Sequence, residues 1–266
     1  MIKLNQLIKA GWLFLILIST IPTCVASENV FTVYDSISGQ FAKLVKKGKP
    51  LPQYSEERVR KLLRELGNHK RFLDSRKFTS SDSDDLWKMC GSAQDIASVY
   101  YTAGMSATAI KGVMTAGIST TDESAIKINV VKYQDEITLL SSFSTRCLGK
   151  ALPLVSEFVK RLKPGEFDST RQQGLIRLRR GVLTAYLGMA EAYSTTSTSL
   201  RNRGLLIEAM ADVSEVHAQA LDLTSREKVR QHLLSSQNML PREFSTHYNK
   251  IIKSMSSKVC KDLCLL

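Results

Sequence analysis

Apolar and small residues recur at alternating steps of three and four along two long stretches near the middle of the chain. The first stretch runs from Leu86 to Gly117 and the second from Ile126 to Phe158. This spacing places the apolar positions along one face of an α-helix. The residues between them, Gly117 to Asp122, are rich in turn and N-cap types, and a short connection makes two helices antiparallel neighbours. The pattern predicts a long central helical hairpin over residues 84–161.

Two cysteines support this hairpin. Cys90 lies 29 residues before position 119 and Cys147 lies 28 residues after it. If the chain reverses direction near residue 119, both cysteines lie at nearly the same level along the two helices. A Cys90–Cys147 disulfide is therefore the preferred pairing, and two buried thiols are the alternative. Cys260 and Cys264 are then left to each other, one helical turn apart. In a different arrangement, these tail cysteines would pin the C-terminus to the central helices.

The rest of the chain has the same helical periodicity, interrupted by turn residues. The predicted helices cover about 30–47, 56–73, 84–117, 126–161, 169–193, 200–221, 224–240 and 241–257. Ser55, Asp168 and Thr224 are the expected N-caps, and Pro153 is expected to break or kink the second arm of the hairpin. The fold class is thus all-α: a mostly antiparallel helical bundle of about seven or eight helices.

The first 26 residues resemble a secretory signal peptide. Lys3 and Lys9 make a basic start, Gly11 to Ile21 is apolar, and Cys24-Val-Ala26 places small residues before a cut at Ser27. We therefore expect an exported protein, periplasmic or secreted. An uncleaved anchor and a lipid anchor at Cys24 are the alternatives. The sequence after residue 26 contains no Asn-X-Ser/Thr sequon, which favours a bacterial export route.

The remaining chain, residues 27–266, is predicted to form a single all-helical domain. It would consist of basic N-terminal helices over 28–77, the central hairpin over 84–161 and C-terminal helices over 168–257. Residues 75–85, which are rich in Ser and Asp, are the expected linker.

Positive charge is concentrated in the N-terminal third. The whole chain has 37 Lys and Arg against 25 Asp and Glu, and residues 43–77 alone hold twelve basic and four acidic residues. The helix predicted there has an apolar stripe and a basic face, a pattern typical of binding to anionic membranes or phosphates. A core-packed helix with a solvated basic face is the alternative. The candidate binding residues are Arg58, Arg60, Lys61, Arg64, Lys70 and Arg71.

Motifs that carry chemistry are missing from the sequence. It has no GxSxG, HExxH, Walker or GxGxxG pattern, which argues against an enzyme and predicts no cofactor. Glu243 and His247 are better explained as a helix-surface contact than as metal ligands, so no metal is predicted. His217 is expected to be a hydrogen-bonded core residue.

Two further clusters of charge are interpreted as solvated helix faces. Arg177, Arg179 and Arg180 form a second basic cluster. Glu208, Asp212 and Glu215 form an acidic edge on a later helix.

Two functions compete. The first is an exported, non-catalytic interaction protein of a bacterial envelope, whose basic third meets an anionic membrane, an envelope polymer or a protein partner. The alternative is an exported small-ligand carrier or enzyme with a site between helices, near the Gly/Ala-rich segment 103–117 and the adjacent Tyr100 and Tyr101. The export signal and the scarcity of aromatic residues in the basic stretch disfavour nucleic acid as a partner.

Overall fold

The structure is a computed structural model that describes residues 29–45, 49–106, 120–163 and 165–265. Within these ranges the protein is an all-α helical bundle, as the sequence predicts, and contains no β-strand. The predicted signal peptide, with Cys24, and the predicted turn as far as residue 119 lie outside the described residues.

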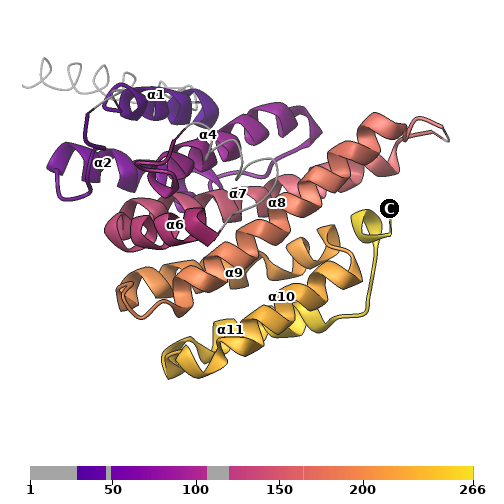
Figure 1. Cartoon of the computed structure of the whole chain (residues 1–266). Helices are drawn as coiled ribbons and strands as arrows, with labels where there is room; N and C mark the ends of the chain where they lie inside the picture. The colour runs from indigo at the N-terminus through magenta and orange to yellow at the C-terminus, as the bar shows by residue number, and fades with distance from the viewer. Residues whose placement is uncertain (1–28, 46–48, 107–119, 164, 266) are drawn as a thin grey trace, which may run out of the picture.

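Ten α-helices and four short 3₁₀ turns make up the described part of the bundle (Figure 1). The α-helices are α1 (Val30–Ala42), α2 (Glu57–Leu66), α3 (His69–Phe72), α4 (Ser83–Tyr101), α6 (Thr120–Lys132), α7 (Gln134–Lys160), α8 (Ser169–Ser194), α9 (Leu200–Ala220), α10 (Leu223–Ser235) and α11 (Ser245–Ser256). The 3₁₀ turns are η1 (Ser80–Asp82), η2 (Gln237–Met239), η3 (Arg242–Phe244) and η4 (Asp262–Cys264).

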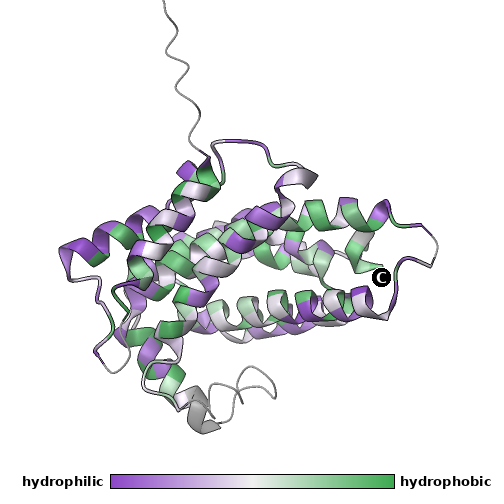
Figure 2. Ribbon diagram, turned by 90° about the horizontal axis from the view of Figure 1, so that it is seen from above, coloured by the Kyte–Doolittle hydropathy of each residue, from purple (hydrophilic) through white to green (hydrophobic). Residues whose placement is uncertain are grey.

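Helix α7 lies between two hydrophobic cores. The first core joins α1–α4 to α7 and contains an aromatic group in which the Tyr34 ring stacks on Phe143 at 5.0 Å and meets the edge of Phe72 at 5.1 Å. The second core joins α7 to α8–α11. Figure 2 shows hydrophobic and hydrophilic positions alternating along most helices, as expected of amphipathic helices in a bundle. No helix in the described part of the chain is long and apolar enough to cross a membrane.

The central prediction is confirmed in one respect: α4 and α7 pack against each other in antiparallel directions. The Ser144 hydroxyl donates to the carbonyl of Cys90 at 3.4 Å, and the hydroxyls of Tyr101 and Ser141 lie 3.3 Å apart. The predicted Cys90–Cys147 disulfide joins the two helices. Cys260 and Cys264 are bonded to each other and not to the cysteines of the central helices.

The hairpin is nevertheless less regular than two straight arms. The first arm ends at Tyr101, well before Gly117, because Gly104 adopts a left-handed φ of +77° that ends the helix. The buried Asn129 side chain then satisfies the end of α4, since it donates to the carbonyls of Tyr101 and Ala103, each at 2.9 Å. The second arm is divided at Tyr133 into α6 and α7, with the ring of Tyr133 buried against Tyr100.

Pro153 is predicted to break or kink the second arm, and the break does not occur, since α7 continues to Lys160. A proline inside a helix costs about 3 kcal/mol. Packing of α7 on both sides outweighs that cost, because its buried positions occur on most of its circumference and contribute to both cores.

Several helix ends differ from their predicted positions. Helix α1 ends at Ala42, and the predicted basic helix is divided into α2 and α3 at Gly67 and Asn68. The side chain of Asn68 starts α3 by accepting from the Arg71 N–H, a cap that the continuous apolar pattern concealed.

The predicted N-cap at Asp168 is confirmed, and the other two are wrong. Glu56 precedes α2 in place of Ser55. Asp222 caps α10 in place of Thr224, because its carboxylate accepts from the backbone N–H of Ser225 at 2.7 Å. Helices α8 and α9 match their predicted ranges to within a residue.

Candidate basic interaction surface

The apolar stripe of the basic helix is buried in the protein core. Val59, Leu63 and Leu66 of α2 are almost fully covered by α1 and α7. A helix that lies on a membrane needs its apolar face free to insert. The structure therefore gives α2 the core-packed arrangement that was the alternative to membrane insertion.

The basic face, in contrast, points outward. Of the six candidate residues only Arg60 is half-buried, and the other five are exposed: Arg58, Lys61, Arg64, Lys70 and Arg71. We call this set of six cations on α2 and α3 the basic face.

Two of the six cations have partners close by. Arg71 forms an ion pair with Glu65 at 2.6 Å, and Arg64 donates to the hydroxyl of Tyr54 at 2.9 Å. The other four, Arg58, Arg60, Lys61 and Lys70, form no ion pair with any residue in the described ranges. Their charge is available to an external anion.

The acidic residues of the same stretch do little to cancel this charge. Asp74 forms an ion pair with Lys150 of α7 at 3.0 Å, and Glu65 is engaged with Arg71. Glu56 accepts from the backbone N–H of Gln53. The basic face can hold an anion electrostatically.

A buried arginine explains the acidic edge of α9, and sequence reasoning missed it. Arg146 of α7 has a side chain only 7% exposed, and it pairs with Asp212 at 2.7 Å and with Glu208 at 3.3 Å. Two of the three carboxylates interpreted as solvated therefore hold α7 and α9 together. Burial, and then Arg146, lower the pKa of nearby His69, whereas the carboxylate of Asp74 acts in the opposite direction.

The second basic cluster is also partly engaged within the protein. Arg177 and Arg180 are exposed, as the solvated interpretation requires. Arg179 instead donates to backbone carbonyls of the C-terminal segment, including that of Cys264 at 3.3 Å.

His217 is buried, but the predicted hydrogen bond is absent. The residue is 1% exposed, and neither ring nitrogen has a hydrogen-bond partner among the described residues. Its ring meets the edge of Tyr186 at 5.4 Å, since α9 directs it into the apolar second core. Burial lowers the pKa of His217 to about 3, because the surroundings cannot solvate the protonated ring.

We expect this histidine to make the fold sensitive to acid. The pKa of His217 is about 3 in the folded protein, below the ordinary value of 6.5. Above pH 6.5 the ring is neutral in both the folded and the unfolded state, so it does not affect stability. Below pH 6.5 the unfolded chain binds a proton that the folded protein does not, and the folded state becomes progressively less stable. The free energy of unfolding should fall by about 1.4 kcal/mol per pH unit from this group alone. The free energy of unfolding, measured by urea titration at several pH values, should fall less steeply with decreasing pH in His217→Phe than in wild type. The His247→Gln variant should behave as wild type. An unchanged slope in His217→Phe would contradict the assignment.

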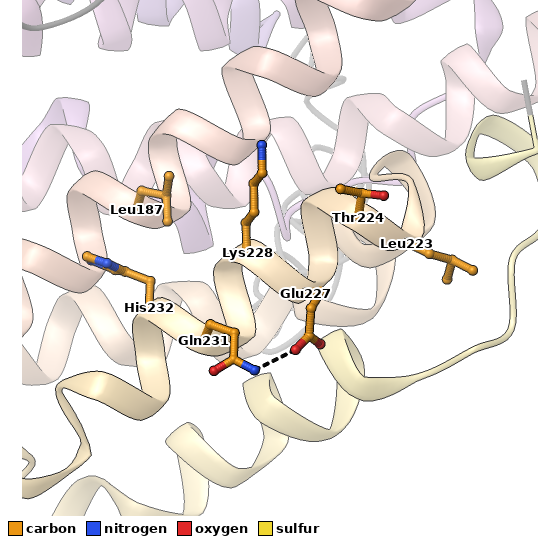
Figure 3. Close-up of a pocket in the computed structure, with 7 residues that line it drawn as sticks. All are labelled: Leu187, Leu223, Thr224, Glu227, Lys228, Gln231 and His232. Carbon is orange, nitrogen blue, oxygen red and sulfur yellow. Dashed lines mark hydrogen bonds between the residues drawn. The ribbon is translucent and has the colours of Figure 1, made fainter.

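A shallow groove lies between α8 and α10 (Figure 3). It has a volume of about 710 Å³ and is lined by Leu187, Leu223, Thr224, Glu227, Lys228, Gln231 and His232. The Glu227 carboxylate is already engaged by Arg230 and by the Gln231 amide, both at 2.6 Å. The acidic group of the groove is thus already occupied by neighbouring side chains.

The alternative ligand site was expected near segment 103–117, of which residues 107–117 lie outside the described part. The two tyrosines beside it serve packing instead. Tyr100 is buried and donates to the carbonyl of Pro52 at 2.7 Å, and Tyr101 lies against Ser141. Within the described residues, no group of three or more His, Cys, Asp or Glu side chains is arranged to hold a metal ion.

Comparison of the chain with protein families, with curated proteins and with solved structures found no match.

Proposed function

We propose that this protein is an exported, non-catalytic helical protein that binds an anionic surface of a bacterial envelope through its basic face. The observation that carries the proposal is a set of four cations that form no ion pair with any described residue: Arg58, Arg60, Lys61 and Lys70. Charges left unpaired on one surface attract polyanions strongly at low salt.

The mode of binding follows from the burial of the apolar stripe. Because Val59, Leu63 and Leu66 are in the core, α2 meets the surface by charge without inserting into it. Phosphate groups of lipids and anionic polymers offer the same chemistry to Arg and Lys. The predicted signal peptide and the two disulfides support a location outside the cytoplasm.

Vesicle binding tests this proposal. The chain from Ser27 to Leu266 should bind phosphatidylglycerol vesicles but not phosphatidylcholine vesicles, and binding should weaken steeply between about 0.05 and 0.5 M salt. Each cation near an anionic surface contributes about 1 kcal/mol. Replacing Arg58, Arg60, Lys61 and Lys70 with Gln should therefore weaken binding by on the order of a hundredfold or more.

A matched control removes the same charge elsewhere. Arg177, Arg180, Lys228 and Lys253 are exposed on α8, α10 and α11, and their replacement with Gln lowers the net charge equally. This control should retain most of the binding. Equal losses in both variants would show that net charge alone attracts the protein, and would remove the basic face from the proposal.

A further inference from the structure

The two disulfides lie in different environments. Cys90 and Cys147 are both buried in the first core, between α4 and α7. Cys260 is half-buried at the surface, and only its partner Cys264 is covered. Of the four bonded cysteines, Cys260 is thus the most exposed to a reductant in solution.

The segment that contains the exposed bridge, residues 257–265, is held by side chains and not by a long helix. Arg226 of α10, which is 1% exposed, donates to the carbonyls of Ser257 and Val259, each at 2.8 Å. The same guanidinium donates to the carbonyls of Ala218 and Leu221 at the end of α9. One buried cation therefore joins the tail to the end of a helix.

A second arginine repeats this arrangement beside the bridge. Arg179 of α8 donates to the carbonyl of Ala220 in α9 and to the carbonyls of Leu263 and Cys264 in the tail. The side chain of Leu263 is 3% exposed and belongs to the second core. Gln219 adds two hydrogen bonds, to the carbonyl of Val259 and from the N–H of Lys261.

These contacts need the tail carbonyls to converge on two guanidinium groups. The disulfide fixes the turn that presents them, since it links residues only four apart in sequence around η4. We propose that Cys260–Cys264 is a reversible thiol–disulfide exchange site, opened by an external dithiol, and that its state controls whether residues 257–265 stay docked.

The exchange is balanced as a two-electron step. A thiolate of the dithiol attacks the Sγ of Cys260, the bond between the two cysteine sulfurs breaks, and the Cys264 sulfur leaves as a thiolate. The second thiolate of the dithiol then attacks the dithiol sulfur that is bonded to Cys260. This step closes the disulfide of the reductant and releases the Cys260 thiolate. The two cysteines take up the two protons that the dithiol lost.

Cys260 is the attacked cysteine because it is the more exposed of the two.

Graded reduction of the folded protein tests the proposal. The probe is dithiothreitol, followed by thiol alkylation and peptide mass mapping. Cys260–Cys264 should be half reduced at a dithiothreitol concentration at least about tenfold below that needed for Cys90–Cys147. Equal midpoints, or reduction of the central bridge first, would overturn the exchange site.

Tail release is measured separately by limited trypsin digestion. Cleavage after the exposed Lys258 and Lys261 should accelerate once the tail bridge is open, while cleavage after the exposed Lys77, before η1, stays constant. The Cys260→Ser/Cys264→Ser variant should show the fast cleavage without reductant. Unchanged tail cleavage in the reduced wild-type protein would overturn the control of docking by the bridge.

Discussion

Replacing Gly149 with Ala should destabilise the protein by about 1–3 kcal/mol, although alanine is the better helix former. A Cβ at Gly149 of α7 would lie 2.3 Å from Cγ1 and 2.9 Å from Cβ of Val213 in α9. Valine in a helix has one strongly preferred χ1 rotamer, so the side chain cannot turn away. The two helices must separate, and the measurement is the free energy of unfolding in urea.

Helix α8 offers a matched control for this substitution. Gly181 and Gly188 lie in α8 with nothing within 4 Å of an added Cβ. Gly181→Ala should therefore stabilise the protein by roughly 1 kcal/mol, the opposite sign to Gly149→Ala. The double variant Gly149→Ala/Val213→Ala should recover part of the loss. A stabilising Gly149→Ala would show that α7 and α9 do not approach as closely as described.

Removal of the central disulfide should have an effect of similar or larger size. The Cys90–Cys147 bridge closes a loop with a sequence separation of 57. Its loss in Cys90→Ala/Cys147→Ala should lower the free energy of unfolding by about 4 kcal/mol, because the unfolded chain regains the entropy of the open loop. Thermal and urea unfolding of the oxidised wild type and the variant provide the measurement.

The Cys260–Cys264 bridge provides a comparison in which the closed loop is much shorter. The two cysteines are four positions apart in sequence, so the entropy of the open loop is smaller. Cys260→Ala/Cys264→Ala should therefore lower the free energy of unfolding by only about 2 kcal/mol. Equal losses for the two bridges would contradict the entropic argument and would indicate that local packing governs both.

Periodicity predicts this fold well where one face of a helix is apolar and the cap is local. The ranges of α8 and α9, the Asp168 cap and the pairing of Cys90 with Cys147 all follow from spacing along the chain. The apolar stripe of α2 also follows, although its pattern alone does not distinguish a core-packed helix from a membrane-bound one.

The errors occur where a distant side chain decides the local structure. Asn129 caps α4 from another helix, and Arg146 is buried because two carboxylates of α9 meet it. Neither partner is near in sequence, so no local pattern indicates them. The exposed candidates of the basic face lay on the surface as expected, whereas buried Arg226 and half-buried Arg179, which hold the tail, could not be told from ordinary surface arginines.

The position of α7 limits how this protein can be divided. Its residues Phe143 and Cys147 belong to the first core and Leu152 belongs to the second, so one helix packs against both cores. A cut on either side of α7 leaves one half of the bundle without the helix that covers its core. The two halves are therefore distinct in space but not separable modules, and neither could be gained, lost or exchanged alone during evolution without exposing the core of the other.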